Sequence, residues 1–493
     1  MVLSTKMKNI LFTHSYFYKF DPKQWKTKQP YPPLATITAA AFLRSFGYEV
    51  NLFDAAFKDS PEEIISAIKN YQPDYLVIYD DGFNYLTKMC LTNMREAALR
   101  MIQIAKENNL TVIVSSSDAS DHYEKYLNAG ADFIIIGEAE HTLKELVDSL
   151  ANKSGNFLSI DGLIFKRENQ IIKTNQRQIE RNLDMFPMAA WDLVNVDDYR
   201  KIWKSGRKEF SLNIATTRGC PFKCNWCAKP IYGNRYNSRS PQNVVDEIEF
   251  LQKKFNVNYF WFCDDIFGLK PGWVQEFRKV VKKRGLNFRY KIQSRVDLLL
   301  KEDTVDALAE SGADIVWVGA ESGSQKILDA MDKGTTIKEI YEATKLLKSK
   351  NIKVAFFLQF GYLGEMKEDI DKTIKMVLEL MPDEIGISVS YPLPGTKFYE
   401  NVKEQMKAKT NWTDSDDLAV MFRSTFHSAY YKKLHRYVHK VYKKKLGLNS
   451  LRKILLQPLS TDKRILRSAL LTLYYFPAEI FDKFKLRKLE SLT

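Results

Sequence analysis

Three cysteines lie close together near the middle of the 493-residue chain, in the stretch Cys220-Pro-Phe-Lys-Cys224-Asn-Trp-Cys227. A loop with this spacing can aim three thiolates at one inorganic centre. Iron–sulfur clusters take cysteine thiolates as ligands, and three thiolates on a four-iron cluster leave one iron open to a small molecule. A structural zinc site is the competing interpretation, but it takes four Cys or His ligands in close pairs, and no second pair follows. The stretch therefore predicts an iron–sulfur cluster.

Further chemistry-bearing residues follow short apolar segments downstream of the cysteines. They stand directly after residues 259–262, 290–293 and 315–319, and they are Asp264, Asp265, Arg295, Glu321 and Ser322. If those segments are parallel strands, their carboxyl ends share one edge, which is where sites on such folds are built. The sequence therefore predicts that these side chains line a common site.

Each of these residues also has a purely structural interpretation. Asp264 and Asp265 fit a turn with an Asp cap for the next helix. Arg295 can pair with Asp297, two residues along the chain, instead of with a ligand carboxylate. Glu321 fits a carboxylate favoured by the dipole at a helix N-terminus.

Residues 1–150 predict a doubly wound α/β domain. Apolar strands are expected at 9–13, 49–53, 75–79, 111–115 and 133–137, with helices at 33–47, 62–71 and 95–108 between them. Continuous apolar strands that alternate with helices indicate a parallel sheet covered on both faces. Ligands on such a sheet lie beyond the carboxyl ends of its strands.

The rest of the chain predicts three further parts. Residues 151–205 are expected to be a connector with a small hairpin near 162–173. Residues 206–400 resume the alternation with about six strand–helix units, fewer than a closed eightfold barrel has. Residues 401–493 predict a helical region in which Tyr430, Tyr431, His435 and His439 pack into the core, with a place at the mouth of the second α/β region as the alternative. Cys90 and Cys263 are expected to be buried as small apolar residues.

Composition and charge restrict the function classes. Five cysteines without pairwise spacing argue against a disulfide framework and for a reducing cytoplasm. No apolar stretch is long enough to suggest a membrane span, and no signal peptide is evident. Of the net charge of +14, most resides in residues 421–493, which hold 17 Lys or Arg against 4 Asp or Glu. This basic tail indicates an anionic partner surface or a solvated helical face.

The cysteine stretch resembles the signature of the radical S-adenosylmethionine (SAM) enzymes. Thr216-Thr-Arg-Gly precedes the first cysteine, Pro221-Phe222 follows it, and the aromatic Trp226 stands before the last. The resemblance implies a partial (β/α)6 barrel in which Cys220, Cys224 and Cys227 bind a four-iron, four-sulfur cluster. It further implies that SAM chelates the open iron and is cleaved by one electron to a 5′-deoxyadenosyl radical.

The family also suggests roles for the residues after the strands. By resemblance, Asp264 and Asp265 contact the amino group of SAM, and Glu321 and Ser322 face its ribose or carboxylate. Arg295 is a candidate for the carboxylate, and Trp226 belongs to the cofactor-binding loop. An electron donor such as flavodoxin or ferredoxin is implied as a partner.

Residues 1–150 resemble the cobalamin-binding domain that precedes many radical SAM domains. The similarity lies in Tyr31-Pro-Pro-Leu34 and in Gly137-Glu-Ala-Glu-His-Thr-Leu143. The D-x-H-x-x-G motif, whose histidine ligates cobalt in many cobalamin proteins, is absent. His122 is expected on the surface instead of at a cofactor. The resemblance implies cobalamin as a second cofactor, and a Rossmann-like scaffold without it is the alternative.

The family leads to several hypotheses for function. The first is cobalamin-dependent methylation of an unactivated centre in a small or lipophilic substrate. The second is oxidative cyclisation of the kind carried out by anaerobic tetrapyrrole cyclases. Methylthiotransfer to tRNA requires additional N-terminal cluster cysteines, which are not there. A non-catalytic cobalamin-binding or nucleic-acid-binding protein has no need of an open iron, so nucleic acid is not an expected partner. Peripheral membrane contact through the basic C-terminus is expected.

Overall fold

The computed structural model describes residues 8–89, 91–228, 231–406, 408–457 and 463–491. Cys90 therefore lies outside the described residues. The described residues form two compact units. Unit one takes the chain up to residue 222 together with 228–292 and 411–417, and unit two takes 223–227, 293–410 and 418–493. The division passes through the cysteine stretch, so each unit holds one side of it. The predicted domain boundaries after residues 150, 205 and 400 remain predictions.

A seven-stranded sheet forms the first part of unit one, in the order β2-β1-β3-β4-β5-β6-β7. Its strands are β1 (Asn9–Thr13), β2 (Glu49–Phe53), β3 (Tyr75–Tyr79), β4 (Thr111–Ser115), β5 (Phe133–Ile135), β6 (Leu163–Arg167) and β7 (Gln170–Lys173). The first five are parallel, and the last two pair antiparallel. The predicted hairpin is confirmed, and it extends the sheet, so part of the predicted connector belongs to the N-terminal domain.

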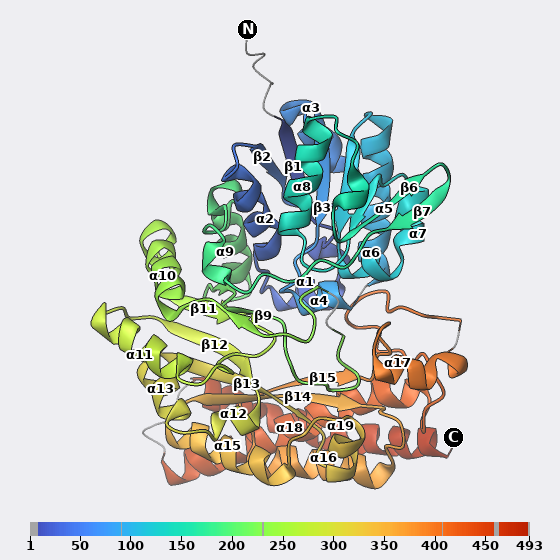
Figure 1. Ribbon diagram of the computed structural model, residues 1–493. Helices are drawn as coiled ribbons and strands as arrows, with labels where there is room; N and C mark the ends of the chain where they lie inside the picture. The colour runs from blue at the N-terminus through green and yellow to red at the C-terminus, as the bar shows by residue number, and fades with distance from the viewer. Residues whose placement is uncertain (1–7, 90, 229–230, 407, 458–462, 492–493) are drawn as a thin grey trace. The chain divides into compact units, whose positions relative to one another are not determined.

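Helices lie on both faces of this sheet (Figure 1). The longer ones are α2 (Leu34–Arg44), α3 (Ile64–Tyr71), α5 (Thr92–Glu107), α7 (Tyr123–Ala129) and α8 (Glu140–Ala151), and the short ones are α1 (Pro22–Thr27), α4 (Tyr85–Lys88) and α6 (Ser117–Asp121). Strand residues such as Leu11, Ile78 and Val112 are fully buried between the helix layers. The order β2-β1-β3-β4-β5 places a topological switch point between β1 and β3, which is where doubly wound sheets bind ligands.

The remainder of unit one carries the beginning of the second α/β region. Parallel strands β8 (Leu212–Ile214), β11 (Tyr259–Phe262) and β12 (Arg289–Ser294) pair with one another. Helices α9 (Val196–Ser205), α10 (Pro241–Phe255) and α11 (Trp273–Lys283) accompany them. A two-stranded antiparallel ribbon, β9 (Thr217–Arg218) with β10 (Asn237–Ser238), brackets the loop that contains the cysteines.

Unit two continues the alternation with three parallel strands, β13 (Ala313–Glu321), β14 (Lys353–Phe360) and β15 (Glu384–Val389). The helices between and around them are α12 (Val296–Leu299), α13 (Thr304–Glu310), α14 (Gln325–Ala330), α15 (Ile337–Ser349), α16 (Lys367–Leu380) and α17 (Lys397–Val402). The six predicted strands of the second region are all found. The predicted α/β fold class, with its N-terminal parallel sheet and helical C-terminal region, is confirmed.

Two long helices end the chain, α18 (Ser428–Leu456) and α19 (Lys463–Glu490). Tyr430 and Tyr431 on α18 are buried, as predicted, whereas His435 and His439 are only partly buried. Helix α19 continues through Pro477. Within the described part of the chain, none of the helices combines the length and the apolar character that a membrane crossing requires.

Candidate functional site

The chain enters the cysteine loop through a buried ionic cluster in unit one. Arg218 on β9 donates to Glu138 at 2.5 Å and to Glu140 at 2.6 Å, and all three side chains are buried. Both glutamates belong to the connection from β5 into α8, so this arginine ties the cysteine loop to the N-terminal sheet. The next residue, Gly219, has a φ of +79°, and a Cβ there would lie 2.0 Å from the carbonyl oxygen of Arg235. Only glycine fits directly before Cys220.

Asp264 also fixes the backbone just before the cysteine loop. Its carboxylate, fully buried after β11, accepts hydrogen bonds from the backbone N–H groups of Thr216 at 2.6 Å and Thr217 at 2.9 Å. Burial raises the pKa of Asp264 to about 6, although these hydrogen bonds oppose the shift. Its neighbour Asp265 forms an ion pair with Lys88. The contact of these two carboxylates with SAM stays a prediction. In the structure, Asp264 holds the backbone that leads into the cysteine loop, and Asp265 pairs with Lys88 of the N-terminal helix α4.

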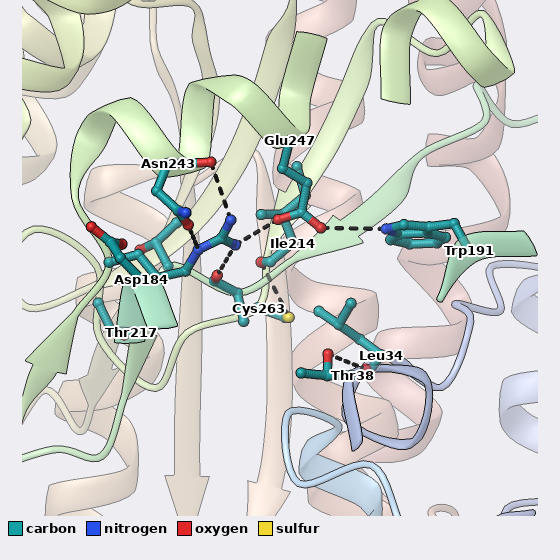
Figure 2. Close-up of polar contacts among 12 residues, drawn as sticks. Leu34, Thr38, Asp184, Trp191, Ile214, Thr217, Asn243, Glu247 and Cys263 are labelled. Atoms are coloured by element: carbon teal, nitrogen blue, oxygen red, sulfur yellow. Dashed lines mark hydrogen bonds and ion pairs between the residues drawn. The ribbon is translucent and has the colours of Figure 1, made fainter. Parts of the chain in front are cut away.

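A second buried cluster supports the end of β8 (Figure 2). Arg239 donates to the carbonyl oxygen of Ala215 at 2.9 Å and to Glu247 at 2.5 Å. The other oxygen of Glu247 accepts from the indole N–H of Trp191 at 3.3 Å. The Cys263 thiol lies 3.3 Å from the carbonyl oxygen of Ile214 and is buried, as predicted. The backbone that leads to the cysteines is therefore held by charged and polar partners from several elements.

In unit two, Asn225 anchors the cysteines on either side of it. Its side-chain NH2 donates to the carbonyl oxygen of Ala330 at 2.7 Å, and its side-chain oxygen accepts from the Tyr362 hydroxyl at 2.7 Å. Its backbone N–H donates to Met331 and its carbonyl accepts from Phe398. Because both ends of the side chain and both backbone groups are bonded, Asn225 fixes the backbone between Cys224 and Cys227.

A buried cation lies beside the same segment. Lys333 donates to Glu321 at 2.8 Å, and its Nζ is 6.0 Å from the centre of the Trp226 ring. Burial works against the charge of Lys333, but the Glu321 carboxylate and then Cys224 outweigh it and raise its pKa. Lys333 is therefore charged at neutral pH, next to a cysteine of the predicted cluster.

Glu321 stands in an unusual backbone conformation. Its φ is +53°, and the register between β13 and β14 shifts between Gly319 and Glu321. A non-glycine residue in the left-handed region is uncommon and concentrates at functional sites. The bulge aims the carboxylate at Lys333, which agrees with a site at the end of β13.

The other predicted residues of unit two also have protein partners. Arg295 pairs with Asp297 at 2.9 Å, the structural alternative that the sequence offered, and it donates to the carbonyl oxygen of Lys333 at 2.8 Å. Ser322 is buried, lies 3.2 Å from the Thr373 hydroxyl and accepts from the backbone of Ser324. Arg295 thus supports the loop that carries Lys333, and Ser322 supports the turn into α14.

The donor set of the loop fits an iron–sulfur cluster. All three thiols are partly exposed, and none is in a disulfide. The Trp226 indole N–H is buried and has no hydrogen-bond partner among the described residues, so it is a donor that a bound ligand would satisfy. Nowhere in the described ranges do three Cys, His, Asp or Glu side chains lie close enough to hold a single metal ion.

The switch point of the N-terminal sheet is tied together by carboxylates. Ser15, after β1, donates from its backbone and its hydroxyl to Asp80, after β3, at 2.7 and 2.9 Å. Asp81 accepts from the backbone of Ala35 and Phe83. Burial raises the pKa of Asp81 to about 6. This edge therefore holds its carboxylates mainly with neutral donors.

Residues at this edge fit the chemistry of a corrin ring, which carries amide side chains. The Ser117 hydroxyl, after β4, is buried with no partner in the described parts of the chain. His122, predicted on the surface, is partly buried 3.8 Å from Asp118. Ile231 packs on Gly82, and Tyr232 stacks on Phe83 with ring centres 5.5 Å apart.

The open space beside this edge is small. A cavity of about 50 Å³ is lined by Phe83, Thr217 and Arg218, among others. A corrinoid is far larger than this cavity.

The roles of several residues of the site were not predicted from the sequence. Arg218 belongs to the Thr216-Thr-Arg-Gly segment before Cys220, but its partners Glu138 and Glu140 are about 80 positions away in the sequence. Asn225 and Lys333 were not predicted. Asn225 had a weak signal, since it lies between two predicted ligands, and Lys333 had none.

Models of two families match the chain. Residues 214–377 match the radical SAM superfamily, and residues 26–147 match the B12 binding domain. The first range contains all three cysteines together with Asn225, Glu321 and Lys333. The second contains β3, with Asp80 and Asp81 after it, and the two glutamates that hold Arg218.

Individual proteins of this kind are similar over most of the chain. An uncharacterised methyltransferase of Pyrococcus horikoshii is 27% identical, over 77% of this chain and 81% of its own. An anaerobic magnesium-protoporphyrin IX monomethyl ester cyclase of Synechocystis is 25% identical, over 79% and 76%. The radical SAM methyltransferase TsrM of Kitasatospora setae, solved with cobalamin and a [4Fe-4S] cluster, has a TM-score of 0.68 at 18% identity. That alignment covers 81% of this chain and 78% of TsrM, and it shows a shared fold.

Proposed function

Because the chain belongs to the radical SAM superfamily and joins to it a B12-binding domain, we propose that it is a cobalamin-dependent methyltransferase. The substrate class is a small or lipophilic molecule with an unactivated carbon. The family implies a four-iron, four-sulfur cluster, SAM and cobalamin as its cofactors, and the three thiols of the cysteine loop fit the first of them.

The observation that carries this proposal is the Arg218 cluster. Transfer of a methyl group from cobalamin to a radical requires the two cofactors to act on one substrate. Arg218, two residues before Cys220, is clamped between Glu138 and Glu140 of the matched B12-binding domain. A buried, doubly paired arginine is costly to separate from its partners, so it holds the start of the cysteine loop on that domain.

The chain's own residues bind and orient. Cys220, Cys224 and Cys227 hold the cluster, while Asn225 and Asp264 fix the backbone on either side of it. Lys333 presents a positive charge to the anionic thiolates or to the SAM carboxylate. The cofactors, when bound, supply the electron that cleaves SAM and the methyl group that is transferred.

The proposal is testable before the substrate is known. Enzyme reconstituted anaerobically with iron, sulfide and cobalamin is given a reductant and SAM carrying a deuterated methyl group. Mass spectrometry is expected to find the label on the protein-bound cobalamin, and chromatography to find 5′-deoxyadenosine. The Cys224→Ala variant should form no 5′-deoxyadenosine, whereas Cys263→Ala should. Absence of label from cobalamin in enzyme that cleaves SAM would refute methyl transfer through cobalamin.

Oxidative cyclisation is the second candidate. The cyclase of Synechocystis covers as much of this chain as the methyltransferase of Pyrococcus does. Product mass separates the two reactions, because methylation adds one methylene unit and cyclisation removes hydrogens. Both reactions need an external one-electron donor, for which a flavodoxin or ferredoxin in a reducing cytoplasm is our proposal.

A further inference from the structure

Helix α19 carries a continuous apolar stripe that faces solvent. Leu466, Leu470, Leu473, Pro477, Ile480 and Phe484 follow one another at intervals of four and three residues. Leu473 is 78% exposed, Phe484 69% and Ile480 67%. Residues at these intervals lie on one face of a helix. Tyr474 and Phe481, also exposed, widen the stripe on one side.

The opposite face of α19, which packs on α18, is mixed and buries Ala469, Thr472, Asp482 and Leu486. Asp482 is buried between Lys433 and Lys440, at 2.9 and 2.7 Å, and Glu479 pairs with Lys444. The two helices approach each other closely at Gly447 of α18, where a Cβ would lie 1.9 Å from the Thr472 hydroxyl. The helix therefore buries a carboxylate while most of its large apolar side chains face solvent, which is unusual for a surface helix. The ion pairs hold it in this orientation, because turning it would leave Asp482 without its lysines.

The charges around the stripe have one sign. Exposed Lys463, Arg467, Lys485 and Lys488 lie at its ends and along one side. The three acidic residues of α19, Glu479, Asp482 and Glu490, have partners on α18 or α16. The exposed face consequently combines large apolar side chains with cations.

We propose that α19 docks this protein on the surface of an anionic lipid bilayer, with the apolar stripe in the headgroup region. Apolar area together with Lys and Arg is what interfacial helices use to bind anionic lipid. A second copy of the chain fits this face poorly, since its stripe would bring cations against cations. The two most exposed leucines of α18, Leu455 and Leu456, are 82% and 69% exposed. They add to the exposed apolar area of the α18–α19 pair.

The test uses the full-length protein and sedimentation with vesicles. Protein is expected to co-sediment with vesicles of phosphatidylcholine and phosphatidylglycerol and far less with phosphatidylcholine alone. The double substitution Leu473→Glu and Ile480→Glu should lower binding by more than about tenfold, because it places charge in the apolar contact. Arg467→Glu with Lys485→Glu should also lower binding and should weaken its salt dependence.

Matched control variants distinguish binding through this surface from nonspecific binding to vesicles. Leu158→Glu replaces a leucine that is 56% exposed in the N-terminal domain, and Lys69→Glu with Arg181→Glu reverses two exposed cations there. These variants should bind vesicles as the unchanged protein does. Equal binding of the α19 variants would overturn the proposal, as would a dimer in solution that those variants dissociate. Circular dichroism verifies that each variant is folded. The assay needs no methyl transfer, so its outcome is independent of the proposed function.

Discussion

The two sides of the cysteine loop are held by different kinds of interaction. On the side of Cys220, in unit one, the anchors are ionic, with Arg218 between two glutamates and Asp264 under the backbone. On the side of Cys224 and Cys227, in unit two, the main anchor is the neutral side chain of Asn225.

The difference indicates two tasks. A buried ionic cluster is rigid and specific, since removal of one member leaves an uncompensated charge. Such rigidity suits the side of Cys220, which must keep a fixed position on the B12-binding domain. The Asn225 amide carries no charge, and on this second side the buried Lys333 brings a cation near Cys224.

The largest effect is expected where both sides depend on the same ligand set. Cys224→Ala removes one of three thiolates, and anaerobic reconstitution should then leave iron at the background level. Iron and sulfide analysis together with the optical spectrum measures this. Cys263→Ala, which removes a thiol outside the loop, should retain the normal iron content. Full iron loading of Cys224→Ala would mean that the loop is not the cluster site.

Breaking the ionic anchor on the side of Cys220 should lower the free energy of unfolding more than breaking the neutral anchor at Asn225. Arg218→Met leaves Glu138 and Glu140 buried without their cation, and the free energy of unfolding should fall by about 3–5 kcal/mol. Denaturant unfolding followed by fluorescence measures the loss. The triple variant that adds Glu138→Gln and Glu140→Gln should recover much of it. An unchanged unfolding midpoint in Arg218→Met would remove the distinction between the two sides.

The neutral side should respond less in stability. Asn225→Ala leaves the Ala330 carbonyl and the Tyr362 hydroxyl without their partner, which costs about 1–3 kcal/mol. The same variant should lose iron faster than the unchanged protein when a chelator is added, because Cys224 and Cys227 are less well fixed. Asn70→Ala, at an exposed position, is the control. A chelation rate equal to that of the control would contradict a positioning role.

The smallest effect, taken per pH unit, is a pH dependence on the ionic side. The pKa of Asp264 is raised from 3.8 to about 6, so the folded protein holds a proton that the unfolded chain releases. Stability should consequently fall as pH rises from about 4 to about 6, by at most ~1.4 kcal/mol per unit, and this contribution should level off above that range.

Asp264→Asn isolates that slope. The difference in unfolding free energy between the variant and the unchanged protein should vary with pH below about 6 and be constant above it. Asn225→Ala should give a difference that does not vary with pH, because an amide does not titrate. A constant difference for Asp264→Asn across the whole range would show that its carboxylate is not the titrating group.

Much of this protein follows from local sequence. Alternating apolar strands and helices predicted both α/β regions, because periodicity and strand length are local properties. The spacing of Cys220, Cys224 and Cys227 predicted the cluster loop, since its ligands lie within eight residues. The hairpin near 162–173 was predicted as well, but not that it would join the N-terminal sheet, because strand pairing at an edge is a long-range choice.

Only the tertiary structure decided which partners these residues take. Arg218 meets Glu138 and Glu140, and Lys333 meets Glu321, through contacts that no spacing rule encodes, because they depend on which strand ends come together. The same holds for α19, whose sequence shows apolar and basic residues without saying which face is covered. The buried Asp482 between two lysines of α18 turned the apolar stripe outward, since burying a carboxylate without cations would cost more than exposing leucines.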